Sequence, residues 1–400
     1  MEIRPILSAL MRNHLGAALV ALQIAVTMAI LCNGAFIVYQ RIETMTRDTG
    51  MDVANIFTID SQPIGSEYDE ESATWRDLEV IRSIPGVVAA TTTNSYPLSG
   101  GGWGEGLRPS PDREQASITA NLYFMDEQGL ETLGVELAKG RDFDPTELYI
   151  RGRNDSKLPQ VGIITQALAD ELFPDDDALG KLIYPGEDPV EVVGILRKMQ
   201  GSWLGWSGVE RVFLVPGLLL DGYVRYMIRT EPGKRDELMP LVEEALAQAD
   251  SQRILRRMRT LEEYRANSYN SDRTMAVVLS TVMGLLIIVT GLGIVGLVSF
   301  LVNQRTKQIG TRRALGAQRF HVVRYFLVEN WLITSIGLTL GLAMTVGLNY
   351  WMVHSFDMER LDWIYIPIGL VLIWTLGIGS ALGPARRASR VPPAVATRTV

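Results

Sequence analysis

The chain has 400 residues, of which 47% are hydrophobic, and its formal net charge is -7 at pH 7. This acidic balance argues against nucleic acid as a partner, because binding to a phosphate backbone requires a basic surface. The single cysteine excludes a disulfide within the chain. The charge is also unevenly divided: we count about 25 basic and about 40 acidic residues between positions 41 and 274, so the rest of the chain is net positive.

Four stretches of the sequence contain no charged residue and are long enough to cross a membrane. They comprise residues 15–39, 275–302, 331–353 and 363–382. Each has about 20 to 28 residues, the length that a helix needs to cross a hydrocarbon core. The first stretch is longer than the apolar part of a signal peptide and lacks a small-x-small cleavage site, so it predicts an uncleaved helix. The sequence therefore predicts an integral membrane α-helical protein with four transmembrane helices.

The segments that flank these helices predict the orientation of the chain. Basic residues are concentrated in the N-terminal segment 1–14, in the loop 303–330 and in the tail 383–400, whereas the connection 354–362 is mostly acidic. Short loops rich in Lys and Arg remain on the cytoplasmic side of a membrane. We therefore expect both termini in the cytoplasm, a short outer loop at residues 354–362, and one large domain, residues 40–274, outside the inner (plasma) membrane.

Residues 40–274 read as an extracytoplasmic α+β domain, inserted between the first and second transmembrane helices and carrying a stalk helix at each end. Alternating β-rich runs predict strands, and helical spacing of apolar residues predicts helices between them. The strands are predicted near residues 53–60, 87–93, 118–124, 190–196 and 223–230, and the helices near 75–83 and 234–249. The Gly-, Pro- and Ser-rich stretch 95–112 matches no phosphate-binding motif and predicts a surface loop.

Two further features of this domain are a pair of tryptophans and a predicted helix that leads toward the second apolar stretch. Trp203 and Trp206 predict either an exposed tip that meets lipid or a partner, or a packed core. Thr260 and Glu263 form a helix-capping signal, and no helix breaker follows before the second apolar stretch. Residues 260–273 therefore predict one continuous helix that acts as a rigid lever; the alternative is a simple connector.

The outer domain contains no histidine, so no His-based catalytic dyad or metal cluster can form in it. The three histidines, His14, His321 and His354, lie at predicted membrane edges or in the loop 303–330. The sequence contains no G-x-S-x-G, H-E-x-x-H or Walker A motif. We therefore expect a non-catalytic chain without a metal or a cofactor, so that any ATP that drives it is bound by another protein.

The predicted membrane helices contain small-residue motifs and no ionisable side chain except His354 at one edge. Gly337 and Gly341 form a G-x-x-x-G motif in the third stretch, and Gly379 and Gly383 form another at the end of the fourth. Glycines at this spacing allow two helices to approach closely in lipid. An ion-coupled transport pathway normally requires charges inside the membrane, so we do not expect one.

Three groups of sequence motifs, taken in order and with this topology, point to a known family. The first comprises the outer segments ETLGVELAKGRDFDP, QALADELFPDDDALGKLIY and VEVVGILR; the second is the loop segment KQIGTRRALGAQRFHVVRYFLVEN; the third is the tail GPARRASRVPPAVATR. Together they resemble the MacB/FtsX-like permease subunits of ABC transporters, and the resemblance covers nearly the whole chain. The loop resembles the family motif R-E-I-G-x-x-[RK]-A-[LV]-G-A, with Gln308 in place of the acidic residue, so one expected polar contact is missing.

The resemblance implies a dimeric permease, paired with a second copy or a paralogue, that binds a separate cytoplasmic ATPase in trans. It also implies that ATP-driven motion of the membrane helices is transmitted along the stalk helices to the outer domain. Contact with the ATPase is assigned to the residues that match the family motif and its flanks: Arg305, Lys307, Gln308, Ile309, Gly310, Arg312, Arg313, Ala314, Leu315, Gly316 and Ala317. The basic side chains would supply charge-assisted contacts, while Ile309, Ala314 and Leu315 would seat in a groove of the partner. The alternative is a basic topogenic loop without a partner.

Two functions from different classes fit this interpretation. The first is export or extrusion of a peptide, a lipoprotein or an amphiphilic drug, with a periplasmic adaptor protein and membrane lipid as further partners. The second is a non-transporting transmembrane regulator that activates an envelope enzyme such as a cell-wall hydrolase. A membrane-anchored enzyme is disfavoured by the missing catalytic groups.

Overall fold

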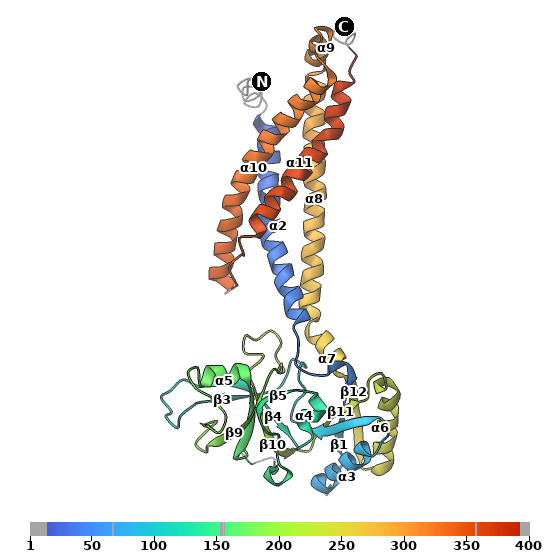
Figure 1. The fold of residues 1–400 in the computed structure, drawn as a ribbon. Coiled ribbons are helices and arrows are strands. Elements are labelled where there is room, and N and C mark those ends of the chain that lie inside the picture. The colour runs from blue at the N-terminus through green and yellow to red at the C-terminus, as the bar shows by residue number, and fades with distance from the viewer. Residues whose placement is uncertain (1–13, 66–67, 153–154, 156, 357, 393–400) are drawn as a thin grey trace. The chain divides into compact units, whose positions relative to one another are not determined.

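The computed structural model describes residues 14–65, 68–152, 155, 157–356 and 358–392, which form two compact units (Figure 1). The helical unit comprises Met1–Thr46 and Ser271–Val400, and the α+β unit comprises Arg47–Asn270. This arrangement confirms the predicted fold class, with the α+β unit inserted between the first and second long helices. Most of the predicted N-terminal segment 1–14, the tail after Pro392 and Asp357 of the predicted loop 354–362 lie outside the described residues.

Four long helices make up most of the helical unit: α2 (His14–Thr46), α8 (Asn270–Gln304), α10 (Arg319–Phe356) and α11 (Tyr365–Ser389). Each is long and apolar enough to cross a membrane. They extend beyond the uncharged stretches of the sequence. For example, α10 begins at Arg319 because Val322, Phe326 and Ile333 already follow the helical spacing of a buried face. A short helix, α9 (Thr306–Ala314), separates α8 from α10.

The centre of the helical unit is an apolar core to which every long helix contributes. Ile24 and Met28 of α2, Ile294 of α8 and Ile373 of α11 are fully buried in it. Large apolar side chains on the opposite faces, such as Leu292 on α8, are exposed. Exposed apolar side chains are typical of helices that contact lipid. Inside the helix the backbone polar groups are paired with one another, as the lipid environment requires.

The two G-x-x-x-G motifs differ in what they contact. A Cβ atom added at Gly337 would lie 2.8 Å from the Ala21 carbonyl oxygen, and one at Gly341 would lie 3.0 Å from the Met28 Cβ, so this pair lies directly against α2. Gly379 and Gly383 have open space in the same direction, with no described atom within 4 Å. The first motif therefore packs α10 on α2, and the second packs on nothing within the described helices of this chain.

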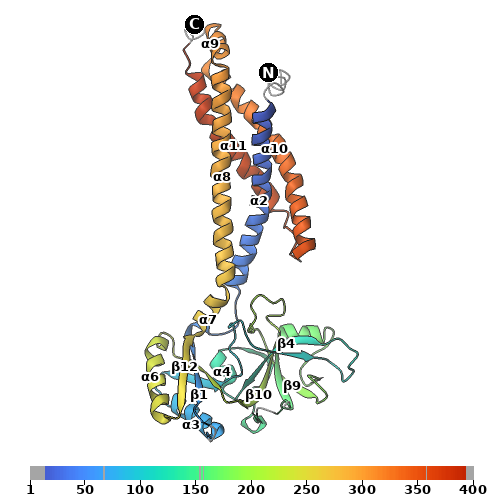
Figure 2. The ribbon, with the colours of Figure 1, turned by 180° about the vertical axis from the view of Figure 1, so that it is seen from behind.

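One part of the α+β unit is a four-stranded antiparallel sheet in the order β12-β1-β11-β2. Its strands are β1 (Ile56–Pro63), β2 (Val87–Thr92), β11 (Val224–Thr230) and β12 (Arg253–Thr260). Helices α3 (Glu70–Arg82) and α6 (Arg235–Ala249) pack together on one face of it (Figure 2). The core between them consists mainly of aliphatic and aromatic residues, including Phe57, Ile59, Leu78, Ile81 and Val242.

The other part of the α+β unit is a mixed sheet in the order β3-β4-β10-β7-β9-β5, with β6 paired to β10 and β8 paired to β9. Its strands are β3 (Trp103–Leu107), β4 (Ile118–Met125), β5 (Leu137–Gly140), β6 (Tyr149–Gly152), β7 (Val161–Thr165), β8 (Leu182–Ile183), β9 (Val190–Leu196) and β10 (Val212–Leu220). The short helices α4 (Gly129–Leu133) and α5 (Gln166–Leu172) and the 3-10 helices Val53–Asn55 and Pro145–Glu147 complete the unit. Phe124, Ile164 and Phe213 are buried in the core of this part.

The segment 260–273 is two helices, and the prediction of one continuous helix is wrong. Helix α7 (Leu261–Ser268) begins with the predicted capping box, in which the Thr260 side chain accepts from the Glu263 N–H and the Glu263 side chain accepts from the Thr260 N–H. The helix then ends at Tyr269, and α8 begins at the next residue.

Packing of α7 on its own unit explains this break. Leu261 and Tyr264 are buried in the α+β unit, and the Ser268 hydroxyl donates to the Leu98 carbonyl oxygen at 2.7 Å. These contacts fix the direction of α7 independently of α8. Tertiary packing thus overrides a sequence that contains no helix breaker.

Candidate functional site

The candidate site is built around α9, and we define the α9 site as residues 305–317 with Tyr325 and Glu329 of α10. Helix α9 lies beside the last turns of α11 at one end of the helical unit (Figures 1 and 2). It ends at Ala314, and two residues later the chain turns at Gly316, which has a left-handed φ of +96°. The N–H groups of Gly316 and Ala317 donate to the carbonyl oxygens of Arg313 and Arg312 at 3.1 and 3.0 Å, which satisfies the end of the helix.

A buried ion pair fixes the start of α9. Arg305 Nη1 lies 2.8 Å from Glu329 Oε2 and also donates to the Tyr325 hydroxyl at 3.0 Å. The Glu329 side chain is 2% exposed and that of Arg305 15% exposed. A carboxylate this deeply buried is stable only when it is paired and hydrogen-bonded. The contact therefore ties the turn before α9 firmly to α10.

A second arginine fixes the other end of α9. Arg313 Nη1 donates to the carbonyl oxygens of Ser389 and Val391 at 2.7 and 3.1 Å. These oxygens follow the last turn of α11, where a helix exposes unpaired carbonyl groups and attracts cations. Helix α9 is thus held to α10 at its start and to α11 at its end.

A third arginine of the α9 site is free of such contacts. Arg312 is exposed, and its guanidinium lies over the Tyr325 ring, 5.5 Å from the centroid, while that of Arg305 lies 5.8 Å from the same centroid. Between α9 and α10 is a cavity of about 130 Å³, lined by Arg305, Gln308, Ile309, Arg312, Ala317, His321, Val322, Tyr325 and Phe326. Hydrogen-bond donors of the arginines and the ring of Tyr325 therefore line the same cavity beside α9.

The residues predicted to contact an ATPase divide into three groups by exposure, and Arg305, Arg313 and Ala317 are half-buried. Leu315 is 83% exposed, and the exposed group also contains Lys307, Gln308, Arg312, Ala314 and Gly316. Ile309 is only 6% exposed and belongs to the core of the helical unit, and Gly310 is buried beside it. Ile309 is therefore unavailable to a groove on a partner, contrary to the prediction. The sequence places it at helical spacing but does not say which face of α9 turns inward.

The sequence analysis did not identify Tyr325 and Glu329 as part of the site. Glu329 is the only acidic residue of the segment 303–330, which is the signal that could have paired it with one of the arginines. The remaining cations at this end of the unit are exposed and make no ion pair within the part of the chain that the structure describes: Lys307, Arg312, Arg319, Arg324, Arg386, Arg387 and Arg390. The surface around α9 is therefore strongly positive.

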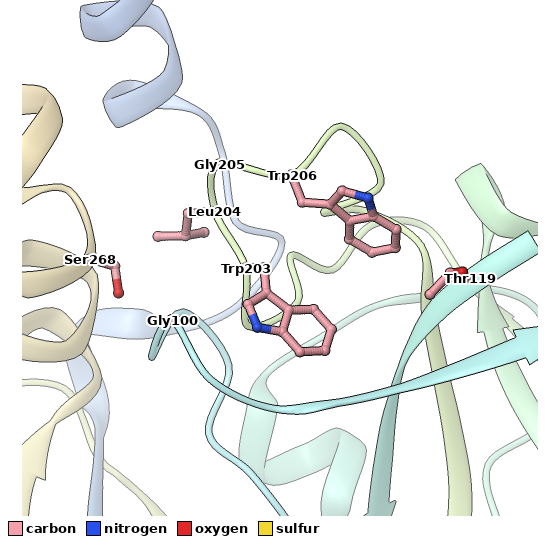
Figure 3. A pocket seen from close by; sticks show the side chains of 7 residues that line it. All are labelled: Gly100, Thr119, Trp203, Leu204, Gly205, Trp206 and Ser268. Carbon is pink, nitrogen blue, oxygen red and sulfur yellow. The ribbon is translucent and has the colours of Figure 1, made fainter.

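The α+β unit contains a second candidate site, an open hollow of about 710 Å³ (Figure 3). Trp203 and Trp206 stand edge to face in it, with ring centroids 6.2 Å apart, and both are half-buried. Gly100, Thr119 and Ser268 lie around them. None of the described residues that line this hollow is titratable, so they offer apolar, aromatic and hydroxyl contact. Among the described residues, no group of His, Cys, Asp and Glu is arranged to hold a metal ion.

Comparison with known proteins matches both units. The family model of the MacB-like periplasmic core domain matches residues 18–252, and that of the FtsX-like permease C-terminal region matches residues 280–393. The macrolide export ATP-binding/permease protein MacB of Neisseria gonorrhoeae is 27% identical over 293 residues, covering 69% of this chain and 43% of that protein. An uncharacterised ABC transporter permease of Bacillus subtilis, YknZ, is 23% identical over 351 residues, covering 82% of this chain and 80% of that protein.

Solved structures of related domains also match. The extracellular domain of the YknZ transporter from Gram-positive bacteria aligns with 50% of this chain and 99% of its own length, with 17% identity and a TM-score of 0.31. The periplasmic region of MacB from Actinobacillus actinomycetemcomitans aligns with 55% of this chain and 94% of its own length, with 15% identity and a TM-score of 0.31. This chain covers 43% to 50% of the length of the macrolide export relatives that it matches.

Proposed function

The chain belongs to the MacB/FtsX-like family of ABC transporter permeases, and from this premise we propose that α9 is the element through which a separate cytoplasmic ATPase drives it. The observation that carries the proposal is the way α9 is held. It is fixed to α10 by Arg305 and to α11 by Arg313, yet it presents Lys307, Arg312 and Leu315 outward. A short helix clamped at both ends transmits a displacement to its neighbours instead of bending away from it.

The charge at this end of the unit supports an orientation. Among the described residues, arginines and a lysine without an ion pair surround α9, and the acid nearest to it in sequence, Glu329, is buried against Arg305. Positively charged loops remain in the cytoplasm. We propose that α9 and both termini lie in the cytoplasm, where an acidic surface of an ATPase would complement them.

Movement of the membrane helices would then act on the α+β unit outside the membrane. We propose that the chain transmits this motion mechanically, since its described membrane helices bury only one ion pair, Arg305–Glu329, and that pair holds α9. The cargo we propose is an amphiphile, a peptide or a lipoprotein. The name of the MacB relatives, which refers to macrolide export, and the tryptophan-lined hollow of the α+β unit both support an amphiphilic cargo.

We propose that the functional permease is a dimer, in which this chain supplies one of the two subunits. Gly379 and Gly383 face open space on α11, and apolar Val371 on the same helix is exposed. We propose that this helix meets a second copy of the chain or a paralogue, and that lipid covers the rest. An adaptor protein on the outer side is a further proposed partner.

The alternative function is activation of an envelope enzyme by the α+β unit, without transport. A pull-down of the chain, solubilised in mild detergent and identified by mass spectrometry, tests both. We expect a P-loop ATPase to be recovered in either case. An outer adaptor recovered with it supports export, a cell-wall hydrolase supports regulation, and failure to recover any ATPase contradicts the assignment of α9.

A further inference from the structure

A polar cavity in the α+β unit, distinct from the tryptophan-lined hollow, has the composition of a ligand site. It has a volume of about 340 Å³ and lies where the start of the glycine-rich segment 95–112 meets strands β11 and β12. Hydroxyl, aromatic and guanidinium groups converge on it: Ser95, Tyr96, Trp103, Arg225, Arg257 and Tyr264. All of these residues belong to the α+β unit.

A buried carboxylate organises one side of the cavity. Asp60 of β1 is 1% exposed, and the hydroxyls of Tyr96 and Tyr223 donate to its two oxygens. Asp60 stands directly opposite Arg225 in the β1–β11 ladder, so the two side chains share a face of the sheet. Because both carboxylate oxygens already accept phenol hydrogens, Asp60 is satisfied without a direct hydrogen bond from an arginine.

The backbone of β12 directs a second arginine to the same place. The β1–β12 ladder shifts register between Thr58 and Asp60, which leaves an extra residue on β12. Arg257 in this bulge has φ of +50°, a left-handed conformation that is strained for arginine. Bulges re-aim side chains, and strained residues of this kind collect at functional sites. The other non-glycine residue with positive φ among the described residues is Leu98, which lies between Tyr96 and Ser99 of the same cavity.

The two guanidinium groups donate no hydrogen bond to a described residue, and the side chains of Arg257 and Arg225 are 67% and 25% exposed. Arg257 Nε is 3.9 Å from Asp60, and Arg225 Nη1 is 4.0 Å from Asp221, so both contacts are longer than a hydrogen bond. Neither arginine side chain donates a hydrogen bond within the residues that the structure describes. Arg225 is instead stacked over the Tyr223 ring, 4.5 Å from its centroid, and Tyr223 is in turn bonded to Asp60.

A buried hydroxyl in the cavity is also without a partner. Ser95 is 8% exposed, and its Oγ forms no hydrogen bond with any described residue. A buried polar atom without a partner is rare in a folded protein, and a bound molecule is one explanation for it. Two arginines and one serine hydroxyl thus offer hydrogen-bond donors to a single cavity.

We propose that this cavity binds a carboxylate that is attached to an aromatic or apolar body. A carboxylate matches the planar donors of Arg225 and Arg257, and the Ser95 hydroxyl completes its coordination. Trp103 and Tyr264 provide aromatic surface for the body of the ligand. The carboxylate belongs either to a small free acid or to the C-terminus of a peptide. The proposal does not depend on α9 or on an ATPase.

Binding is tested on the full-length chain in lipid nanodiscs by saturation-transfer NMR titration. The probes are N-acetyl-phenylalanine, a tripeptide ending in phenylalanine with a free C-terminus, and the C-terminal amide of each. We expect both acids to saturate the site and the amides to bind about 10- to 100-fold more weakly, the effect of a charge-assisted hydrogen bond. Tighter binding of the tripeptide than of N-acetyl-phenylalanine would identify a peptide C-terminus as the source of the carboxylate. Tighter binding of N-acetyl-phenylalanine would identify a small free acid as its source.

Substitutions separate the site from general attraction of anions. Arg257→Gln and Arg225→Gln are each expected to weaken binding of the acids about tenfold or more. Arg256→Gln removes the adjacent arginine, which does not line the cavity, and is expected to change affinity less than about twofold. Arg257→Gly is expected to raise the unfolding temperature while abolishing binding, because glycine relieves the strain and lacks the guanidinium.

Three results would overturn the proposal. The first is equal binding of acids and amides, and the second is the same loss of affinity in Arg256→Gln as in Arg257→Gln. The third is failure of any acid to saturate the unmodified chain. Each of these leaves the coupling role of α9 unaffected, since the cavity and α9 belong to different units.

Discussion

Arg305 and Glu329 form an ion pair across 2.8 Å that joins the turn before α9 to the buried face of α10. Tyr325 accepts a hydrogen bond from the same guanidinium, so the three side chains form one network. With Arg313 bound to the end of α11, this network makes α9 a rigid extension of the membrane helices. In the proposed mechanism, a force applied to α9 is passed to α10 and α11 through these contacts.

Removing one partner of this pair should destabilise the helical unit. Glu329→Gln and Arg305→Gln each leave a buried group without its countercharge, for which about 3–5 kcal/mol is typical. The double variant Arg305→Met with Glu329→Leu should recover most of that loss, because apolar side chains of similar size replace both charges. Thermal unfolding of the detergent-solubilised variants measures the difference. Single variants as stable as the unmodified chain would show that the pair is not buried as described.

The close approach of α2 and α10 should depend on Gly337. Gly337→Leu places a side chain where the Ala21 carbonyl oxygen and Ile24 already lie 2.8 Å from the added Cβ, so the helices must separate. We expect a destabilisation of about 1–3 kcal/mol or more, as for other overpacked cores. Gly379→Leu is the matched control, because its Cβ meets no described atom within 4 Å. Unfolding temperatures that fall equally in both variants would contradict this packing.

The α+β unit should depend strongly on an ion pair buried beneath α3 and α6. The side chains of Asp77 and Arg253 are each 1% exposed and bonded to each other, and the Tyr226 hydroxyl donates to the same carboxylate at 2.6 Å. Asp77→Ala leaves Arg253 buried without its countercharge and should lower the free energy of unfolding by about 3–5 kcal/mol. Asp69→Ala removes the N-cap of the same helix, where the side chain accepts from the Ser72 N–H, and should cost about 1 kcal/mol. Urea unfolding curves compare the two, and a larger effect of Asp69→Ala would contradict this ranking.

Stability of the α+β unit should fall at alkaline pH. Burial and the hydrogen bond to Asp60 raise the pKa of the Tyr223 phenol to about 12, and burial also raises the pKa of Tyr96. An unfolded tyrosine titrates near pH 10. The folded state therefore favours the neutral phenol, and its contribution to stability is complete below about pH 10 and is lost as the pH rises through about 12. Tyr223→Phe should show a shallower loss of stability across this range in unfolding experiments, and an unchanged slope would contradict the assignment.

Much of the architecture could be predicted because its signals are local. Uncharged stretches identify membrane helices, and the β-rich run 190–196 identifies a strand with the bounds that the structure has. The run 53–60 also identifies a strand, but β1 begins at Ile56, after a 3-10 helix at Val53–Asn55. Strand β12 is the contrary case. Its sequence RILRRMRT has four arginines and no clear alternation, and it is a strand because β1, nearly 200 residues earlier, supplies its pairing partner.

The sequence predicted which segment forms the site, but it did not predict how the side chains of that segment are oriented. The basic motif identifies α9, but the inward orientation of Ile309 follows from packing against α10, which no local pattern specifies. Likewise, Arg313 looks identical to Arg312 in sequence, yet one caps α11 and the other remains exposed. The break at Tyr269 has the same origin, since contacts of α7 with distant parts of its own unit decide where the helix ends.

The most direct test of the account is whether exposed side chains of α9 hold a partner ATPase. Arg312→Glu with Leu315→Asp alters two exposed groups and leaves the contacts of Arg305, Ile309 and Arg313 in place. Arg360→Glu, an exposed charge reversal in the connection between α10 and α11, away from α9, is the matched control. The measurement is co-purification of the ATPase and stimulation of its ATP hydrolysis. We predict that the α9 variant folds normally and loses about 90% or more of both, as for hot-spot residues of an interface, while the control retains them. An α9 variant that retains both would contradict the central claim.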